Sequence, residues 1–516
     1  MKILSKKNST SFITFLCVVC SWSQNSISFL NEKEDNVTIS KHIYGHFAEH
    51  LGRCIYDGLY VGEDNTTIPT TNGVRNDIIN ALKELQIPNL RWPGGCFADT
   101  YHWKDGIGPK ETRPTIVNTW WGGITENNSF GTHDFLNLCE LLQTEPYLAA
   151  NIGSGEVQEL ADWVQYVNFS GTSPMSDWRK KNGKEKPWQV KFWGVGNEAW
   201  GCGGNMTADY YADTYKKYAT FMSDYTDGGL FRIASGANSD NYEWTETLMK
   251  KIPKALVKGL ALHYYTVIDW EKKGSAVHFT DEEYFKTMKA AWYMEELVTK
   301  HSAIMDKYDH QKEIALVVDE WGAWYDAEPN QKQSVLYQQN TMRDALIAGL
   351  NLNIFNNHAA RVKMANLAQT VNVLQAIILT KGDKMILTPT YHVMNLYKVH
   401  QEATLLPLEI NSNDFVFNNE KLPAISASAS IDKNNKTHLS LVNIDPSKSQ
   451  EIKITISDKK YKMINGTILT SKQLRDYNSF TNPSVVQPKP FSDFKKTNKE
   501  IIINLPPFSV VVMQLE

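Results

Sequence analysis

The sequence predicts an α/β fold, in which a parallel (β/α)8 TIM barrel precedes an all-β sandwich. Between about residues 41 and 400, eight short apolar runs alternate with polar loops and segments of helical spacing, which is typical of a barrel. After about residue 400 apolar residues recur at every second position, as expected for half-buried strands. The chain has 516 residues, 42% of them apolar, so it can form the core of more than one domain.

The N-terminal residues 1–23 predict a signal peptide. Three lysines precede an apolar stretch from Phe12 to Cys20, and small residues follow it. Nine apolar residues are too few to span a bilayer, whereas this layout is typical of a cleaved secretion signal. We therefore expect cleavage after Ser23 and a secreted or periplasmic protein. A lipoprotein acylated at Cys20 is the alternative, which the bulky Val19 disfavours.

The remaining elements follow in order. Residues 24–40 contain the runs SISFL and NVTIS and predict strand material that pairs with the sandwich. In residues 41–400 the eight expected barrel strands are IYGHFAE, PNLRWPGG, PYLAANIG, VKFWGVGNE, FRIASGA, GLALHYY, IALVVDEW and LNIFNNH. Helical spacing lies between them, for example at Val74, Ile78, Leu82 and Leu85. The polar stretch 171–188 predicts a surface excursion. Residues 401–516, with HLSLVNI, EIKITIS and FSVVVMQLE, predict an antiparallel sandwich.

Composition excludes some functions. The net charge of -4 and the pI near 6.4 give no basic field that would attract nucleic acid. Two of the six cysteines lie in the predicted signal, and the other four, Cys54, Cys96, Cys139 and Cys202, are far apart and lack the spacing of a zinc site. We expect mostly free, buried thiols, with one disulfide left open, and neither a metal nor a cofactor.

Polar residues gather at the ends of the expected strands. Such ends carry Glu49, Arg91, Asn197 with Glu198, Tyr265, Glu320 and His358. In a (β/α)8 barrel the carboxyl ends of the strands meet at one open face, and chemistry takes place there. The distribution therefore predicts a site at that face.

Two glutamates carry the functional prediction. Glu198 ends the fourth expected strand and Glu320 the seventh. A pair of carboxyl groups on a rigid frame can cleave a glycosidic bond, one attacking the anomeric carbon while the other protonates the leaving oxygen. A negative Glu320 nearby would raise the pKa of Glu198 and keep it protonated as the acid. Asn197 can offer its amide to the sugar 2-hydroxyl.

Several long and specific runs lie within about residues 36 to 400, namely YGHFAEHLGRCIYDG, LRWPGGCFADTYHWKDGIGP, GVGNEAWGCGG, LHYY, VDEWGAWY and MANLAQTVNVLQA. These runs resemble glycoside hydrolase family 51, the retaining α-L-arabinofuranosidases. The resemblance implies a barrel with a C-terminal jelly-roll sandwich. It also implies Glu198 as acid/base and Glu320 as nucleophile, without cofactor. Family members often form hexamers, so a homo-oligomer is implied as well.

The same resemblance implies further site residues. Glu49, Arg91, Asn197 and Gln369 would hold the sugar hydroxyls and orient Glu320. Tyr265 would donate a hydrogen bond to the nucleophile, Trp324 would form a pocket wall, and Cys96 stands at a sugar-contact position. The aromatic residue of the loop after the second strand is Trp121 or its neighbour Trp120.

The sequence thus predicts a retaining, exo-acting α-L-arabinofuranosidase that acts on arabinose-containing plant polysaccharides or oligosaccharides. Alternatives are a β-xylosidase or endoglucanase on the same frame, or a carbohydrate-binding protein without turnover. The run HFAEH, residues 46–50, matches an inverted zinc-protease pattern, but that chemistry needs a helix and this run ends an expected strand.

Overall fold

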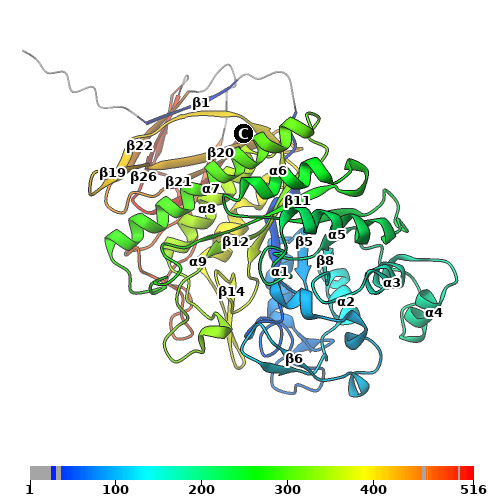
Figure 1. Cartoon of the computed structure of the whole chain (residues 1–516). Helices are drawn as coiled ribbons and strands as arrows, with labels where there is room; N and C mark the ends of the chain where they lie inside the picture. The colour runs from blue at the N-terminus through cyan, green and yellow to red at the C-terminus, as the bar shows by residue number, and fades with distance from the viewer. Residues whose placement is uncertain (1–24, 31–35, 456–460, 462, 498–499) are drawn as a thin grey trace, which may run out of the picture.

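Eight parallel strands close into the predicted barrel in the computed structural model, which describes residues 25–30, 36–455, 461, 463–497 and 500–516 (Figure 1). The predicted signal, residues 1–23, lies outside the described residues. In chain order the barrel strands are β2 (Gly45–Phe47), β5 (Asn89–Trp92), β8 (Glu145–Ala150), β9 (Phe192–Val195), β10 (Phe231–Asn238), β11 (Gly259–Thr266), β12 (Ala315–Ala323) and β13 (Val362–Ala368). The prediction of a (β/α)8 barrel is confirmed.

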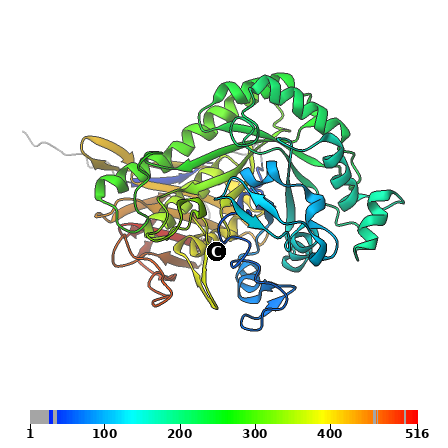
Figure 2. The same cartoon turned by 60° about the horizontal axis from the view of Figure 1, so that its bottom comes forward.

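Helices surround the barrel, as Figure 2 shows. Helix α1 places Ile78, Ile79, Leu82 and Leu85 on its buried face, the pattern expected of an amphipathic helix packed on a sheet. The helices are α1 (Asn76–Leu85), α2 (Thr132–Leu142), α3 (Val157–Asn168), α4 (Pro174–Lys181), α5 (Ala208–Phe221), α6 (Tyr242–Lys251), α7 (Asp281–Tyr308), α8 (Met342–Asn357) and α9 (Pro389–Tyr397).

The run LNIFNNH, expected as the eighth strand, is instead the end of helix α8, and the eighth strand is β13. Helix α8 is buried on every side because it lies between the barrel and the sandwich. On the sandwich side Asn353 donates a hydrogen bond to Ser426 Oγ (3.2 Å) and Asn356 to Ser428 Oγ (3.1 Å). A helix that is buried on all sides has no apolar stripe along one face, so the sequence of α8 does not show the helical spacing of apolar residues.

Two sheets form the sandwich and share one apolar core. One sheet has the order β17 (Leu408–Asn411), β1 (Asn25–Phe29), β22 (Gln450–Thr455), β26 (Glu500–Leu505), β25 (Phe494–Lys496). The other has the order β16 (Thr404–Leu406), β20 (Ile425–Ile431), β21 (Thr437–Asn443), β27 (Ser509–Leu515), β23 (Ile464–Leu469), β24 (Lys489–Phe491). Strand β1 pairs antiparallel with β17 and parallel with β22, so the N-terminal segment contributes one strand (Figure 1).

Within the described ranges, four two-stranded sheets lie outside the barrel and the two sheets of the sandwich. Short hairpins pair β3 (Thr70–Thr71) with β4 (Val74–Arg75), β6 (Ile116–Asn118) with β7 (Ile124–Glu126), β14 (Ile378–Lys381) with β15 (Lys384–Leu387), and β18 (Asp414–Phe417) with β19 (Glu420–Pro423). Among the described residues, no helix combines the length and apolar character needed to cross a bilayer.

The stretch 171–188 contains a short surface helix, α4, where a polar excursion is expected. Ser173 caps its N-terminus, and its fully buried Arg179 donates hydrogen bonds to the carbonyls of Tyr166 (2.7 Å) and Phe169 (2.8 Å). One charged side chain that satisfies several carbonyls therefore fastens this excursion to the end of α3.

Candidate active site

The two glutamates meet at the carboxyl face of the barrel. Glu320 lies near the end of β12, and Glu198 follows β9 in the GNE turn. One carboxylate oxygen of each, together with a ring nitrogen of His263, lie within 4.8 Å of one another. In retaining glycosidases the two carboxyl groups are about 5 to 5.5 Å apart. The pair thus has the separation that attack by one glutamate requires.

Glu320 is held from two sides. Arg91 of β5 donates from Nη1 to its Oε1 (2.8 Å), and the hydroxyl of Tyr265, on β11, donates to its Oε2 (2.6 Å). The side chain of Glu320 is only 6% exposed, so few waters compete for these contacts. Charge-assisted hydrogen bonds of this kind fix the carboxylate in one orientation. Arg91 also donates from Nη2 to Asn197 Oδ1 (2.6 Å), which orients the amide beside Glu198.

Glu49, which follows β2, forms a second buried acidic group. Its Oε1 accepts hydrogen bonds from the backbone amide of Phe97 (3.1 Å) and from Trp121 Nε1 (2.9 Å), and its Oε2 accepts from Gln369 Nε2 (3.0 Å). Burial and the nearby charge of Glu320 raise the pKa of Glu49 to about 7, although the three donors oppose the shift. The structure therefore brings Glu49, Trp121, Gln369 and Glu320, all predicted from the sequence, into one cluster.

Glu198 differs from Glu320 in its environment. Burial raises its pKa, and a hydrogen bond from His263 Nδ1 to Oε1 (2.9 Å) opposes the rise. The charge of Glu320 raises the pKa further. Its backbone has φ of 39°, a left-handed conformation that a side chain rarely adopts. The carboxyl group that the sequence predicts as the acid is thus the one whose pKa burial raises.

Sequence reasoning missed His263 and Asp319. His263 lies on β11 with its Nδ1 toward Glu198 and its Nε2 3.2 Å from Asp319 Oδ1. Asp319 also accepts a hydrogen bond from the Tyr147 hydroxyl (2.6 Å). Burial alone would lower the pKa of His263, but Glu320, Asp319 and Glu198 raise it to about 10. His263 is therefore an imidazolium at neutral pH. Its position two residues before Tyr265 was the available signal, since alternate strand residues share a face.

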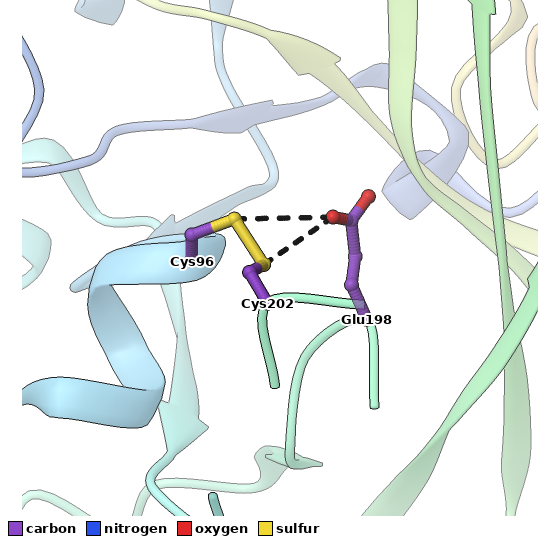
Figure 3. Close-up of side chains that lie close together, drawn as sticks. All are labelled: Cys96, Glu198 and Cys202. Atoms are coloured by element: carbon purple, nitrogen blue, oxygen red, sulfur yellow. Dashed lines mark hydrogen bonds between the residues drawn. A yellow bond between two sulfur atoms is a disulfide. The ribbon is translucent and has the colours of Figure 1, made fainter. Parts of the chain in front are cut away.

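A disulfide joins Cys96 to Cys202 beside Glu198 (Figure 3). Cys96 begins the short 3-10 helix η2 (Cys96–Thr100) after β5, and Cys202 lies in the turn after β9. The expectation of mostly free thiols holds for Cys54 and Cys139, which are free and buried, whereas the other pair is bonded.

The remaining predicted residues fall into two groups. Trp324 follows β12 and packs edge-to-face on Tyr265, with ring centroids 5.1 Å apart. Trp121 contacts Glu49, while Trp120 is 43% exposed, so Trp121 is the aromatic residue at the site. His358 caps helix α8 and lies 2.7 Å from Glu295. His358 is not part of the active-site cluster, because residues 352–358 end helix α8 and do not form the expected strand.

In the part of the chain that the structure describes, two groups of side chains have the spacing of metal ligands. Cys96, Glu198 and Cys202 form one, but both sulfurs are committed to the disulfide. Glu198, His263 and Glu320 form the other, and there the protonated imidazole has no lone pair to offer. In HFAEH, His46 lies on strand β2 rather than on a helix, and His50 accepts a hydrogen bond from Trp92 Nε1 (3.1 Å). The helix that zinc-protease chemistry needs is not formed by this run.

Comparisons with known proteins agree on one family. Residues 81–283 match the family model of the alpha-L-arabinofuranosidase 1 domain, and residues 319–509 match that of the alpha-L-arabinofuranosidase C-terminal domain. A Bacteroides ovatus protein named intracellular exo-alpha-L-arabinofuranosidase is 52% identical over 93% of both chains.

Solved structures give the same result. The GH51 arabinofuranosidase of Xanthomonas axonopodis pv. citri has a TM-score of 0.93 and 44% identity, covering 96% of this chain and 100% of its own. The alpha-L-arabinofuranosidase of Thermotoga maritima, solved with arabinose, has a TM-score of 0.83 and 30% identity over 95% and 99% of the chains.

The prediction of a secreted or periplasmic protein needs correction. The Bacteroides ovatus relative, which matches nearly the whole chain, is named as intracellular. This finding contradicts export. The prediction depended only on the basic and apolar composition of residues 1–23, which lie outside the described residues.

Proposed function

This chain belongs to glycoside hydrolase family 51 and is an exo-acting α-L-arabinofuranosidase, and on that premise we propose how its residues perform the reaction. Glu320 acts as the nucleophile and Glu198 as the acid/base of a double displacement. The observation that carries the proposal is the placement of these two carboxyl groups within 4.8 Å in opposite environments. Arg91 and Tyr265 stabilise charge on Glu320, whereas burial favours a proton on Glu198.

In the first step a carboxylate oxygen of Glu320 attacks the anomeric carbon, and the proton of Glu198 passes to the departing oxygen. The product is an arabinofuranosyl ester of Glu320. Because the ester is neutral, it no longer raises the pKa of Glu198. Glu198 then accepts a proton from the incoming water, which displaces Glu320 and restores the original anomeric configuration.

Six polar or aromatic groups lie next to the pair. We assign Glu49, Arg91, Asn197 and Gln369 to the sugar hydroxyls, since their donors and acceptors converge on the cluster described above. Trp121 and Trp324 form apolar walls. Cys96 contacts the site through its disulfide sulfur, 3.9 Å from Glu198 Oε2.

The substrate class is proposed as terminal α-L-arabinofuranosyl groups on arabinan, arabinoxylan or their oligosaccharides. A β-xylosidase on the same fold is the nearest alternative, so the two activities must be compared directly. We expect turnover of 4-nitrophenyl α-L-arabinofuranoside to exceed that of the β-xyloside. A kcat/KM in favour of the β-xyloside would reject the substrate assignment.

Azide rescue tests the two roles. Glu320→Ala and Glu198→Ala should each lose at least about 100-fold in kcat, because each removes a group needed at the reacting carbon. Azide should restore turnover of a substrate with a good leaving group, giving the inverted glycosyl azide with Glu320→Ala and the retained one with Glu198→Ala. Glu243→Ala, which changes an exposed glutamate at the start of α6, is the control and should keep full activity. Full activity in Glu320→Ala would contradict the mechanism.

We further propose a homo-oligomer, since hexamers are a feature of the family that the sequence resembles. Light scattering on the purified chain tests it. The expected mass is a multiple of 58.7 kDa, and a single monomeric species would reject the proposal.

A further inference from the structure

The Cys96–Cys202 disulfide lies directly against the carboxyl group of Glu198 (Figure 3). Cys202 Sγ is 3.4 Å from Glu198 Oε2, and Cys96 Sγ is 3.9 Å from the same oxygen. The other oxygen, Oε1, faces His263 Nδ1. The two oxygens of one carboxyl group therefore have different neighbours, a protonated ring on one side and two bonded sulfurs on the other.

A bonded sulfur cannot donate a hydrogen bond, because it carries no hydrogen. It can accept one weakly. A proton on Oε2 can thus point toward sulfur, whereas a negative charge there gains nothing from it. By contrast, Oε1 receives a hydrogen bond that favours the charged form. The disulfide side of Glu198 is the side on which a transferable proton is best held.

The disulfide also ties together two loops at the barrel face. It links η2, after β5, to the turn after β9, across 106 residues of sequence. That turn folds back on Glu198, whose carbonyl accepts hydrogen bonds from the amides of Gly201 (2.7 Å) and Gly203 (3.1 Å). Asp99 of η2 adds a second link by accepting from the amide of Asn197 (3.1 Å). The backbone of Glu198, in its left-handed conformation, is thus fixed from η2.

We propose that the Cys96–Cys202 disulfide is a positioning element for the acid/base: it fixes the turn that carries Glu198 and places two sulfurs that cannot donate against Oε2, so that this oxygen carries the proton for the leaving group. The inference rests on the proposed role of Glu198. It makes both cysteines part of the acid machinery, although neither sulfur reacts with substrate.

Reduction provides the perturbation. A dithiol such as dithiothreitol attacks one sulfur, forms a mixed disulfide and closes to its own cyclic disulfide, so that two electrons pass to the protein and both sulfurs end as thiols. Both cysteines are partly exposed and so within reach of the reagent. The new S–H groups can donate to Oε2, which stabilises the carboxylate and lowers the pKa of Glu198. The basic limb of the pH profile should therefore move to lower pH.

Three forms of the full chain separate the two effects of the disulfide. Reduced wild type and Cys96→Ser/Cys202→Ser lack the link and supply donors. Cys96→Ala/Cys202→Ala lacks the link and supplies none. Each is compared with the oxidised enzyme on an activated aryl arabinofuranoside, which needs little acid assistance, and on an unactivated alkyl arabinofuranoside, which needs it fully. Alkylation and mass spectrometry of the 96–202 peptide confirm the state of each sample.

We expect reduction to lower kcat/KM for the alkyl substrate at least about ten-fold and for the activated substrate less than about three-fold. The basic limb should shift down in the reduced and serine forms but not in the alanine form. The alanine form should also be indifferent to dithiothreitol, which makes it the control for other effects of the reagent. Equal losses on both substrates, or pH profiles that coincide in all forms, would overturn the proposal.

Failure of this inference is distinguishable from failure of the proposed function. If Glu198→Ala retains activity on the alkyl substrate, the role of Glu198 is wrong. If Glu198→Ala loses that activity but reduction leaves it intact, the acid assignment stands and the disulfide proposal falls. Both experiments use the same two substrates, so one data set decides between these outcomes.

Discussion

Replacing Asp319 by asparagine removes a buried negative charge from the network around the proposed catalytic pair, Glu198 and Glu320. Asp319 is 2% exposed and lies next to Arg91 (3.7 Å) and His263 (3.2 Å), and it accepts a hydrogen bond from Tyr147. The neutral asparagine amide no longer offers a negative partner to the Arg91 guanidinium or to the His263 imidazolium. Breaking a buried ion pair from one side costs about 3–5 kcal/mol in unfolding free energy.

This loss of unfolding free energy corresponds to a decrease in the melting temperature. A barrel of about 360 residues unfolds with an entropy of about 0.75 kcal/mol/K, at about 2.1 cal/mol/K per residue. A loss of 3–5 kcal/mol therefore lowers Tm by about 4–7 °C. Calorimetry at pH 6.5 measures it.

The pH dependence identifies His263 as the affected group. Its pKa in the folded protein, about 10, lies above its ordinary value of 6.5, so the stability it contributes is full below pH 6.5 and is lost as pH rises through about 10. Without Asp319 this pKa falls, and the loss begins at lower pH. We expect Tm of Asp319→Asn to decline between pH 6.5 and 9, where the wild type is still protected.

Asp309→Asn is the matched control. Asp309 is also buried and pairs with Arg361 (2.8 Å), but it follows α7, away from the catalytic pair. It should lose a similar amount of stability without the added pH dependence. Identical Tm curves for Asp319→Asn and the wild type across pH 6 to 9.5 would refute the reasoning.

Two further substitutions probe the site and the frame. Tyr265→Phe removes the hydroxyl that donates to Glu320 but keeps the ring that packs on Trp324, and a hydrogen bond to a charged group is worth about 1.5–3 kcal/mol. Steady-state kinetics should show kcat lowered about 10- to 100-fold and calorimetry a Tm lowered by about 2–4 °C, and a kcat loss below three-fold would count against the contact. Arg179→Met leaves buried carbonyls unpaired and should lower unfolding stability by about 2–4 kcal/mol, with kcat at 25 °C unchanged; chemical denaturation followed by an activity assay checks both.

The barrel and the position of the glutamate pair at its carboxyl face could be predicted from the sequence for one reason. Parallel strands buried on both faces read as continuous apolar runs, and the first polar residues after such a run mark the carboxyl face of the barrel. Glu198 and Glu320 are each the second of two such residues, after Asn197 and Asp319. Helix α8 was misread for the opposite reason, because complete burial removed the contrast between its faces.

The inner part of the site depended on features that a linear pattern does not show. Neighbouring residues of a regular strand point to opposite faces, so Asp319 was not expected beside Glu320. The pairing of β12 with β13 shifts register between Val318 and Trp321, and such an irregularity re-aims side chains. The partner of Cys96 lies 106 residues away, a distance over which spacing rules carry no information.

The insertion of β1 between β17 and β22 has a consequence for synthesis on the ribosome. The first of its partner strands emerges about 380 residues after it, which corresponds to roughly 20–75 s at 5–20 residues per second. Until then an apolar strand edge with Ile27 in it has no neighbour, and the sheet can close only when translation is nearly complete. A nascent chain stalled after the barrel should therefore be the species that most needs a chaperone.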